Sequence, residues 1–378
     1  MRPFRFTDIQ GGEALIGVSS PNRTIERFGL GGCDLGYPVY DGKRDRLYLL
    51  FGDSFNQANF LESGKDLDWR SQTMGIVDSF KANKTFRFDS FYSRPGEEKA
   101  SSLLSSHHEN KLEMTKIPTG GLCLNGTLYF YYFDICSWDI ENARMMNYGG
   151  LAKFVEGSRF VRVPDMTWVN PEATSALSEV INEDENLVKR YSLDAAAHQN
   201  RFFTEVYPKD FGGPYVYLYG QGPYRTTGIY LARIKKESIE DFSALEYFVG
   251  LENGKPRFEK APKALSDLVP VLSDCCGEFS LLHLEDGDRY IIFGTRLDKS
   301  ADKKREVVYY VSASPEGPFA SPTVLIASDD PCLLNCSAYA PLTDESFFDS
   351  KSRRLSLVLS RWLPCYAPIT LSLKLEDL

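Results

Sequence analysis

The amino-acid sequence predicts an all-β fold, a five-bladed β-propeller with a short helical insertion. Tyr-, Leu-, Ile- and Phe-rich runs recur five times along the 378 residues, and each is followed by a second β-type segment. Runs that are apolar at consecutive positions are typical of strands covered on both faces. Several such sheets can bury one another by stacking radially around a channel. We therefore expect one propeller domain over residues 1–378, and a two-sheet sandwich is the competing all-β fold.

The five runs mark one strand in each expected blade. They lie sixty to ninety residues apart and begin at Leu47, Thr127, Tyr215, Arg289 and Leu355. They read "LYLLFGDSF", "TLYFYYFDICSW", "YVYLYGQGPY", "RYIIFGTRL" and "LSLVLSRWLPCY". The second segments read "TMGIVDSF", "GGLAKFVEGSRFVRV", "GIYLARI", "EVVYYVSAS" and "ITLSLKL". Because the blades differ in length and share little sequence, the predicted repeat is one of structure.

One insertion is predicted to be helical, over about residues 170–190. In "NPEATSALSEVI", Asn170 is placed to cap the helix and Pro171 to open its first turn, and the apolar residues that follow fall on one face. We expect this helix to lie outside the blades. A second short helix is expected in "KKESIEDFSALEYF", just before Gly250.

The composition excludes several classes of partner. The formal net charge is −9, from 52 acidic and 43 basic residues, and no Lys/Arg-rich run stands out. A nucleic-acid partner is therefore not expected. No apolar stretch has the length of a signal peptide or a membrane span, so we expect a soluble chain without a membrane partner. The oligomeric state and the compartment stay open.

No metal or other cofactor is expected. The eight cysteines form no C-x-x-C pair of pairs, and His107 and His108 lie in a polar segment that is typical of a solvated loop. No P-loop, dinucleotide fingerprint or G-x-S-x-G elbow is found in a strand-to-helix context. The sequence therefore does not favour nucleotide hydrolysis, hydride transfer or acyl transfer as the activity of the protein.

The first run ends abruptly on a carboxylate. Five apolar residues, Leu47–Phe51, precede Gly52 and Asp53, and Asp34 lies upstream in the glycine-rich "GLGGCDLGYP". A packed strand would hold Asp53 in position, and Gly52 would let the backbone turn closely into a polar cavity. Two carboxyl groups in one cavity push their pKa values apart, as glycoside hydrolysis requires. The alternative is structural: Asp34 caps a turn and Asp53 ends a strand.

Several segments together resemble one known family. They are "CDLGYP", "LFGDSF", "IPTGGLCLNGTLYFYYFDICSW", "MNYGGLAKF", "VYLYGQGPYRTTGIYLARI", "CGEFSLLHLEDGDRYIIFGT", "EGPF" and "LSLVLSRW". The sequence resembles a family of five-bladed propellers formerly catalogued as a domain of unknown function, which includes endo-D-arabinanases. Those glycoside hydrolases cleave the arabinan of mycobacterial cell walls. The resemblance covers nearly the whole chain, although relatives of one fold need not share a substrate.

The resemblance implies three catalytic residues. Asp34 matches the first of the family's paired aspartates, in its "D-L-G" segment, and Asp53 matches the second, in "G-D-[ST]-F". Glu278 matches the acidic residue of the "G-E-x-S" segment. The sequence departs from the family in "WRSQTMG", where Gln72 replaces the usual Asn. This departure affects the details of sugar recognition.

Aromatic and planar polar side chains at the ends of the predicted strands are candidates for substrate binding. Furanosides are hydroxyl-rich and uncharged, so their sites combine aromatic faces with Arg, Asn and Gln donors. The candidates are Arg70, Trp138, Asn147, Tyr148, Gln221, Arg225, Arg296 and Trp362. For each one, a structural role that braces neighbouring loops is about as well supported.

The leading hypothesis is a glycoside hydrolase acting on a furanose polymer, D-arabinan-like by resemblance. We expect an inverting reaction with Asp34 as the base and Asp53 or Glu278 as the acid, with carboxyl groups roughly 6.5 to 9.5 Å apart; a retaining pair would lie near 5 Å. One alternative is a glycan-binding propeller without catalysis. Another is a propeller enzyme of different sugar chemistry, a lyase or a phosphorylase.

Overall fold

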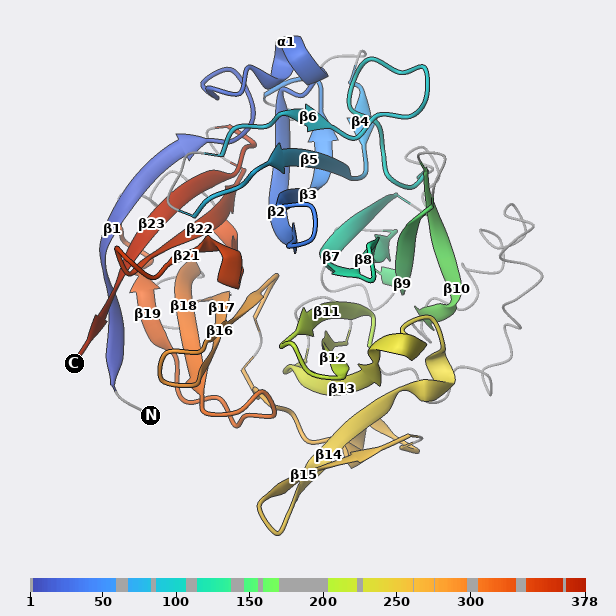
Figure 1. Ribbon diagram of the computed structural model, residues 1–378, viewed down its shortest axis with the longest axis vertical. Helices are drawn as coiled ribbons and strands as arrows, with labels where there is room; N and C mark the ends of the chain where they lie inside the picture. The colour runs from blue at the N-terminus through green and yellow to red at the C-terminus, as the bar shows by residue number, and fades with distance from the viewer. Residues whose placement is uncertain are drawn as a thin grey trace. The chain divides into compact units, whose positions relative to one another are not determined.

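The computed structural model describes residues 3–58, 67–82, 86–106, 114–136, 146–155, 159–169, 203–222, 227–260, 262–274, 276–297, 305–330, 338–362 and 365–378. Strands dominate these residues and form five antiparallel sheets (Figure 1). The fold class is therefore the predicted all-β five-bladed propeller, with one sheet per blade. The helix predicted over about residues 170–190 lies outside the described residues. No helix of the described part is long and apolar enough to cross a membrane.

The chain divides into two compact units, each described by itself. The first consists of Met1–Leu103, Cys276–Pro315 and Phe319–Leu378, and the second of Leu104–Cys275 and Glu316–Pro318. Blades 1, 4 and 5 belong to the first unit, and blades 2 and 3 to the second. The single domain expected from the sequence stays a prediction.

The first unit contains three sheets, whose strands follow in hydrogen-bonded order. Blade 1 consists of β2 (Gly32–Asp41), β3 (Arg46–Phe55), β5 (Thr73–Asp78) and β6 (Ser90–Phe91), with β4 (Trp69–Arg70) paired to β3. Blade 4 consists of β16 (Ser280–Leu284), β17 (Arg289–Leu297), β18 (Arg305–Ser312) and β19 (Thr323–Ile326). Blade 5 consists of β20 (Ala338–Leu342), β22 (Arg354–Arg361), β23 (Ile369–Asp377) and β1 (Phe4–Ala14), with β21 (Phe348–Asp349) paired to β22. Helix α1 (Thr24–Phe28) and the 3₁₀ turn η7 (Glu345–Phe347) lie between strands.

The second unit contains two sheets. Blade 2 consists of β7 (Thr115–Leu124), β8 (Thr127–Ile135), β9 (Met146–Val155) and β10 (Arg159–Val169). Blade 3 consists of β11 (Glu205–Asp210), β12 (Tyr215–Gln221), β13 (Tyr230–Lys235), β14 (Glu246–Glu252) and β15 (Lys255–Glu259). Three 3₁₀ turns are η4 (Lys236–Ser238), η5 (Phe242–Ala244) and η6 (Leu265–Asp267).

Each apolar run forms the second strand of its sheet. These strands are β3, β8, β12, β17 and β22. The first strand of each blade, and not the apolar one, forms an edge of its sheet; in the first unit, edge strand β2 contacts β20 and β22 of blade 5. The second strand is the more apolar one because it has hydrogen-bonded neighbours on both sides and sheet faces that are covered. In β3 the side chains of Leu47, Leu49, Leu50 and Phe51 are fully buried.

The second predicted helix, in residues 235–248, is wrong. The segment forms η4 and η5 and then enters β14. The Asp241 side chain accepts a hydrogen bond from Ser243 N, which favours a short turn. Leu245 and Tyr247, two residues apart, both enter the hydrophobic core of the second unit, a spacing that fits a strand. Tertiary packing therefore overrides the helical tendency of the segment.

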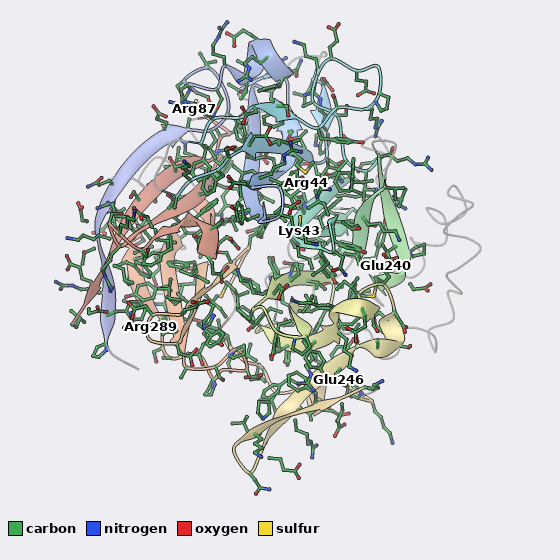
Figure 2. All side chains as sticks on the ribbon, viewed as in Figure 1. Lys43, Arg44, Arg87, Glu240, Glu246 and Arg289 are labelled. Atoms are coloured by element: carbon green, nitrogen blue, oxygen red, sulfur yellow. The ribbon has the colours of Figure 1, made fainter. Side chains whose placement is uncertain are left out.

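The first strand of the chain completes the last blade. β1 pairs antiparallel with β23, from Phe4 opposite Asp377 to Ala14 opposite Ile369 (Figure 1). The end of this pair is held by Arg289 on β17 (Figure 2). Its buried guanidinium is 3.1 Å from Asp377 Oδ1 and 4.6 Å from the centre of the Phe4 ring. A residue of blade 4 therefore stabilises the pairing of β1 with β23 that completes blade 5.

Arg289→Ala is expected to lower the free energy of unfolding by about 2 kcal/mol, because it removes the ion pair of a buried guanidinium with the half-exposed Asp377 together with a cation–π contact. Arg5→Ala is the control: Arg5 pairs with Glu376 in the same strand pair, but its side chain is 58% exposed. Its effect should stay within about 0.5 kcal/mol. Urea unfolding of the two variants measures the difference, and equal losses would show that burial of Arg289 does not hold the closure.

Candidate active site

Asp53 lies inside strand β3. From the sequence it had been expected at the point where the strand ends. The strand continues through Gly52 and Asp53 to Phe55. Trp69, on the short strand β4 that pairs with β3, donates a hydrogen bond from Nε1 to Asp53 Oδ1 at 2.8 Å. On the other face of β3, Ser54 Oγ lies 2.9 Å from Thr73 Oγ1. Packing on both faces therefore fixes the direction of the Asp53 carboxylate.

Asp34 is presented by a distortion of the edge strand β2. The register against β3 shifts on both sides of Leu35, and Leu35 has a left-handed backbone with φ of 63°. A β-bulge of this kind re-aims a side chain, and a non-glycine residue in this conformation costs about 1–3 kcal/mol. The amide of Leu35 donates to Ser360 Oγ of β22 at 2.7 Å. Blade 5 therefore supports the distortion that orients Asp34.

Gly52 leaves room for the Asp34 carboxyl group. A Cβ atom at Gly52 would lie 2.3 Å from Asp34 Oδ1 and 3.1 Å from Leu35 Cδ1. Gly52 was expected to allow a close turn, but the backbone here is a continuing strand. Glycine is needed at position 52 because the Asp34 carboxyl group packs directly against the backbone of β3 at this point and leaves no space for a side chain.

Three acidic side chains interact electrostatically in the first unit. Asp34, Asp53 and Glu278 are 8%, 5% and 5% exposed. Burial, and then the negative charge of Asp53, raises the pKa of Asp34 well above its usual range; the charge of Glu278 adds in the same direction. Hydrogen bonds from Tyr339 and Tyr366 oppose this rise of the Asp34 pKa. The structure thus brings together the three carboxyl groups that the sequence analysis selected.

Two tyrosines of the first unit face Asp34. Tyr339, on β20, donates from its hydroxyl to Asp34 Oδ2 at 2.8 Å. Burial, and then the negative charge of Asp34, raises the pKa of Tyr366 well above its usual range. The Tyr366 hydroxyl therefore keeps its proton and can donate it in a hydrogen bond to Asp34.

Of the predicted substrate-binding residues, three described ones lie in the first unit. Arg70 is buried; it donates to Gly29 O at 3.0 Å and pairs with Asp68. Arg296 pairs with Glu306 across β17 and β18. Trp362, directly after β22, is 40% exposed. Two of them are neighbours of acidic residues along the backbone: Arg70 pairs in register with Ser54, which follows Asp53, and Arg296 follows Thr295, whose carbonyl accepts from the amide of Gly277, the residue before Glu278.

The other candidates lie in the second unit or outside the description. Tyr148 is buried in β9. Gln221 is buried in β12 and donates to Glu205 Oε2 at 2.7 Å, an oxygen that also accepts from the Tyr207 hydroxyl at 2.8 Å. Asn147 lies in β9, and its side chain is outside the described part, as are the residues Trp138 and Arg225.

Four residues at the site were missed by sequence reasoning: Trp69, Tyr339, Ser360 and Tyr366. Trp69 carried a usable signal, because it directly precedes Arg70, a substrate-binding candidate, in the segment "WRSQTMG". The other three lie about 300 residues from Asp34 in the chain, and no local pattern connects them to it. Among the residues that the structure describes, no group of three or more His, Cys, Asp or Glu side chains is placed to hold a metal ion.

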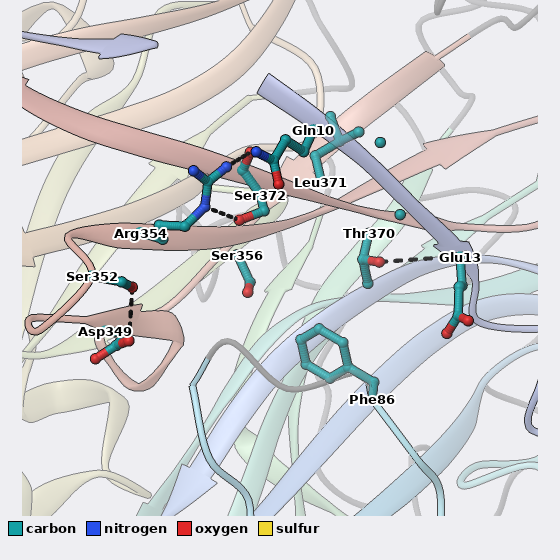
Figure 3. A pocket seen from close by; sticks show the side chains of 12 residues that line it. Gln10, Glu13, Phe86, Asp349, Ser352, Arg354, Ser356, Thr370, Leu371 and Ser372 are labelled. Atoms are coloured by element: carbon teal, nitrogen blue, oxygen red, sulfur yellow. Dashed lines mark hydrogen bonds between the residues drawn. The ribbon is translucent and has the colours of Figure 1, made fainter. Parts of the chain in front are cut away.

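A separate hollow of about 530 Å³ lies on blade 5 (Figure 3). Asp34, Asp53 and Glu278 do not line this hollow. Its charged groups already have partners: Arg354 pairs with Asp8 at 2.7 Å, and Glu13 with Arg87 at 3.0 Å. Asp349 accepts a hydrogen bond from Ser352 (Figure 3). We assign no ligand to this hollow, because its charged side chains already form ion pairs or hydrogen bonds within the protein.

Comparison with known proteins identifies a family and a fold. The model of a family described as "Domain of unknown function (DUF4185)" matches residues 19–371. No curated protein matches the sequence. Many solved structures are similar over most of the chain, including the following three.

A presumed hydrolase from Bacteroides ovatus ATCC 8483 is 13% identical, over 93% of this chain and 87% of that one, with a TM-score of 0.58. An exo-β-1,3-galactanase from Phanerochaete chrysosporium is 8% identical, over 97% of this chain and 64% of that one, with a TM-score of 0.50. The catalytic domain of an α-L-arabinofuranosidase from Coprinopsis cinerea is 10% identical, over 98% and 96% of the chains, with a TM-score of 0.47. At these identities the likeness concerns the fold.

Proposed function

The chain belongs to the DUF4185 family, and from this premise we propose that it is a glycoside hydrolase that cleaves a furanose polysaccharide of the D-arabinan type. The observation that carries the proposal is the interaction of three nearly buried carboxyl groups, Asp34, Asp53 and Glu278. Glycoside hydrolysis needs carboxyl groups held in different protonation states. The sequence resemblance to endo-D-arabinanases supports the substrate class, and the fold likeness to a galactanase supports a carbohydrate substrate.

The raised pKa of Asp34 favours this residue as the proton donor. Its burial, and then the charge of Asp53, disfavours the ionised form, so Asp34 keeps its proton to higher pH than an ordinary aspartate does and can give it to the leaving oxygen. This assignment reverses the role of general base that was expected for Asp34 from the sequence. Trp69 donates a hydrogen bond to Asp53, which stabilises Asp53 as the ionised partner.

The reaction then needs one protonated and one ionised carboxyl group. As the glycosidic C–O bond breaks, Asp34 transfers its proton to the leaving oxygen. A water molecule attacks the anomeric carbon from the opposite face and loses its proton to an ionised carboxylate, Asp53 or Glu278. This sequence inverts the anomeric configuration. Asp34 ends ionised and the base ends protonated, and proton exchange with solvent restores both.

Product release from D-arabinan tests the proposal. The purified protein is incubated with the polymer, the products are separated by chromatography, and the configuration of the first-formed reducing ends is read by NMR. We expect shorter oligosaccharides of inverted configuration, without any requirement for phosphate. Binding of arabinan without product would favour the glycan-binding propeller. A phosphate requirement would indicate a phosphorylase, and an unsaturated product that absorbs ultraviolet light would indicate a lyase.

A further inference from the structure

The edge strand of blade 5 carries the same kind of distortion as the edge strand of blade 1. In β20 the register against β22 shifts between Tyr339 and Pro341, and Ala340 between them has a left-handed backbone with φ of 50°. In β2 the corresponding left-handed residue is Leu35, directly after Asp34. Neither position is occupied by glycine, although glycine would adopt this conformation without strain. Each strand therefore maintains a strained residue immediately after a polar side chain.

The side chains that precede the two left-handed residues, Asp34 and Tyr339, point toward each other. Edge strands β2 and β20 are in contact, and the Tyr339 hydroxyl lies 2.8 Å from Asp34 Oδ2. A bulge in β7 of the second unit differs from these two. There the left-handed residue is Gly120, and the preceding Thr119 donates to a backbone carbonyl, Val206 O, at 2.5 Å. Left-handed non-glycine residues also occur elsewhere in the first unit, including Asp8 in a bulge of β1. At Leu35 and Ala340, however, they directly follow side chains of two blades that meet at a carboxyl group, an arrangement found at functional sites.

We propose that Tyr339 is a positioning residue, which fixes the orientation of the Asp34 carboxyl by donating a hydrogen bond to Oδ2. The proposal rests on the proposed hydrolase function for its kinetic consequence, but its structural part is independent of that function. Ser360 contributes by holding the amide of Leu35, so that blade 5 orients both the backbone and the side chain of Asp34.

Several groups determine how Asp34 titrates. Asp53 from β3 and Glu278 before β16 oppose its ionisation by their charge, and burial opposes it most. Tyr339 from β20 and Tyr366 favour the ionised form, because each donates a hydrogen bond to it. Cys33, the neighbour of Asp34 on β2, stays a neutral thiol, because burial and the charge of Asp34 raise its pKa. Removal of the Tyr339 hydroxyl should therefore move the titration of Asp34 to higher pH.

Tyr339→Phe tests the inference with two readouts. The first is the ¹³C NMR titration of the Asp34 side-chain carboxyl, assigned with Asp34→Asn, which should move to higher pH in the variant. The second is the pH profile of kcat/KM on arabinan. We expect its alkaline limb, where Asp34 loses its proton, to move the same way, and kcat/KM at the optimum to fall about 10- to 100-fold.

Tyr131→Phe is the matched control. Tyr131 is a fully buried tyrosine of blade 2 whose hydroxyl has no hydrogen-bond partner among the described residues. Its substitution should leave both readouts unchanged. An unshifted Asp34 titration in Tyr339→Phe overturns the inference, as does a shift of equal size in Tyr131→Phe. If the wild-type protein cleaves no glycan, the hydrolase function fails, but the NMR titration still decides whether Tyr339 acts on Asp34.

Discussion

Asp34→Asn is expected to slow arabinan cleavage by about 10²- to 10⁴-fold, the usual contribution of general acid–base catalysis, and to raise the free energy of unfolding at pH 7. The gain in stability arises because the native state forces Asp34 into a buried position beside the charge of Asp53. An amide of the same shape carries no charge. Stabilising substitutions of this kind commonly contribute about 0.5–2 kcal/mol.

The pH dependence of this gain follows from the raised pKa of Asp34. The native state binds its proton more tightly than the unfolded chain, whose aspartates titrate near pH 3.9. As the pH rises above about 4, the unfolded state loses this proton first, and the stability of the wild-type protein falls relative to the variant. Urea unfolding at pH 4 and at pH 7 should therefore show a small difference at pH 4 and a larger one at pH 7.

Asp41 provides a control on the same strand. It is also buried, but although burial alone would raise its pKa, hydrogen bonds from Arg44 and from the Lys43 and Arg44 amides lower it. Asp41→Asn should therefore destabilise the protein at pH 7, by about 1 kcal/mol, and the loss should shrink as the pH falls below about 4. If both variants change stability in the same direction, the account of Asp34 is wrong.

Gly52→Ala is expected to reduce activity by about 10²-fold or more, although glycine has no side chain that could take part in the reaction. Its new Cβ would lie 2.3 Å from Asp34 Oδ1, so the carboxyl or the strand must move. A displacement of about 1 Å in a catalytic group can cost this much in rate. We also expect a loss of about 1–3 kcal/mol in the free energy of unfolding, as for other overpacked positions.

Gly213→Ala controls for the loss of glycine as such, because a Cβ there meets no atom within 4 Å. It should leave activity unchanged and alter stability by no more than about 0.5 kcal/mol. Steady-state kinetics on arabinan and urea unfolding measure both effects. Full activity in Gly52→Ala would mean that the position of the Asp34 carboxyl over β3 is irrelevant to the reaction.

The blades could be predicted from sequence because their cause is local. A strand such as Leu47–Phe51 must be buried on both faces, and the run of apolar residues expresses that requirement directly. The same run indicated Asp53, since the carboxylate interrupts it. The role of Gly52 was harder to predict, because the atom that it accommodates belongs to another strand and not to its own turn.

The supporting residues of the site could not be predicted, because their effect depends on contacts across the chain. The distortion at Leu35 is held by Ser360, and the carboxyl of Asp34 by Tyr339. Both partners come from the opposite end of the sequence. Tyr339 lies outside the segments that resemble the family, and Ser360 lies within one of them, "LSLVLSRW", but nothing local in that segment connects it to Asp34. The failed helix near Leu245 has a similar cause, since burial in the core overrode the local tendency.

The dependence of Asp34→Asn on the leaving group tests the central claim most directly. A variant that lacks the acid should lose cleavage of arabinan, but on a dinitrophenyl arabinofuranoside, whose leaving group needs no proton, it should retain activity within about tenfold of the wild type. Equal losses on both substrates would contradict the role of Asp34 as proton donor. Full activity on both would contradict its place in the active site.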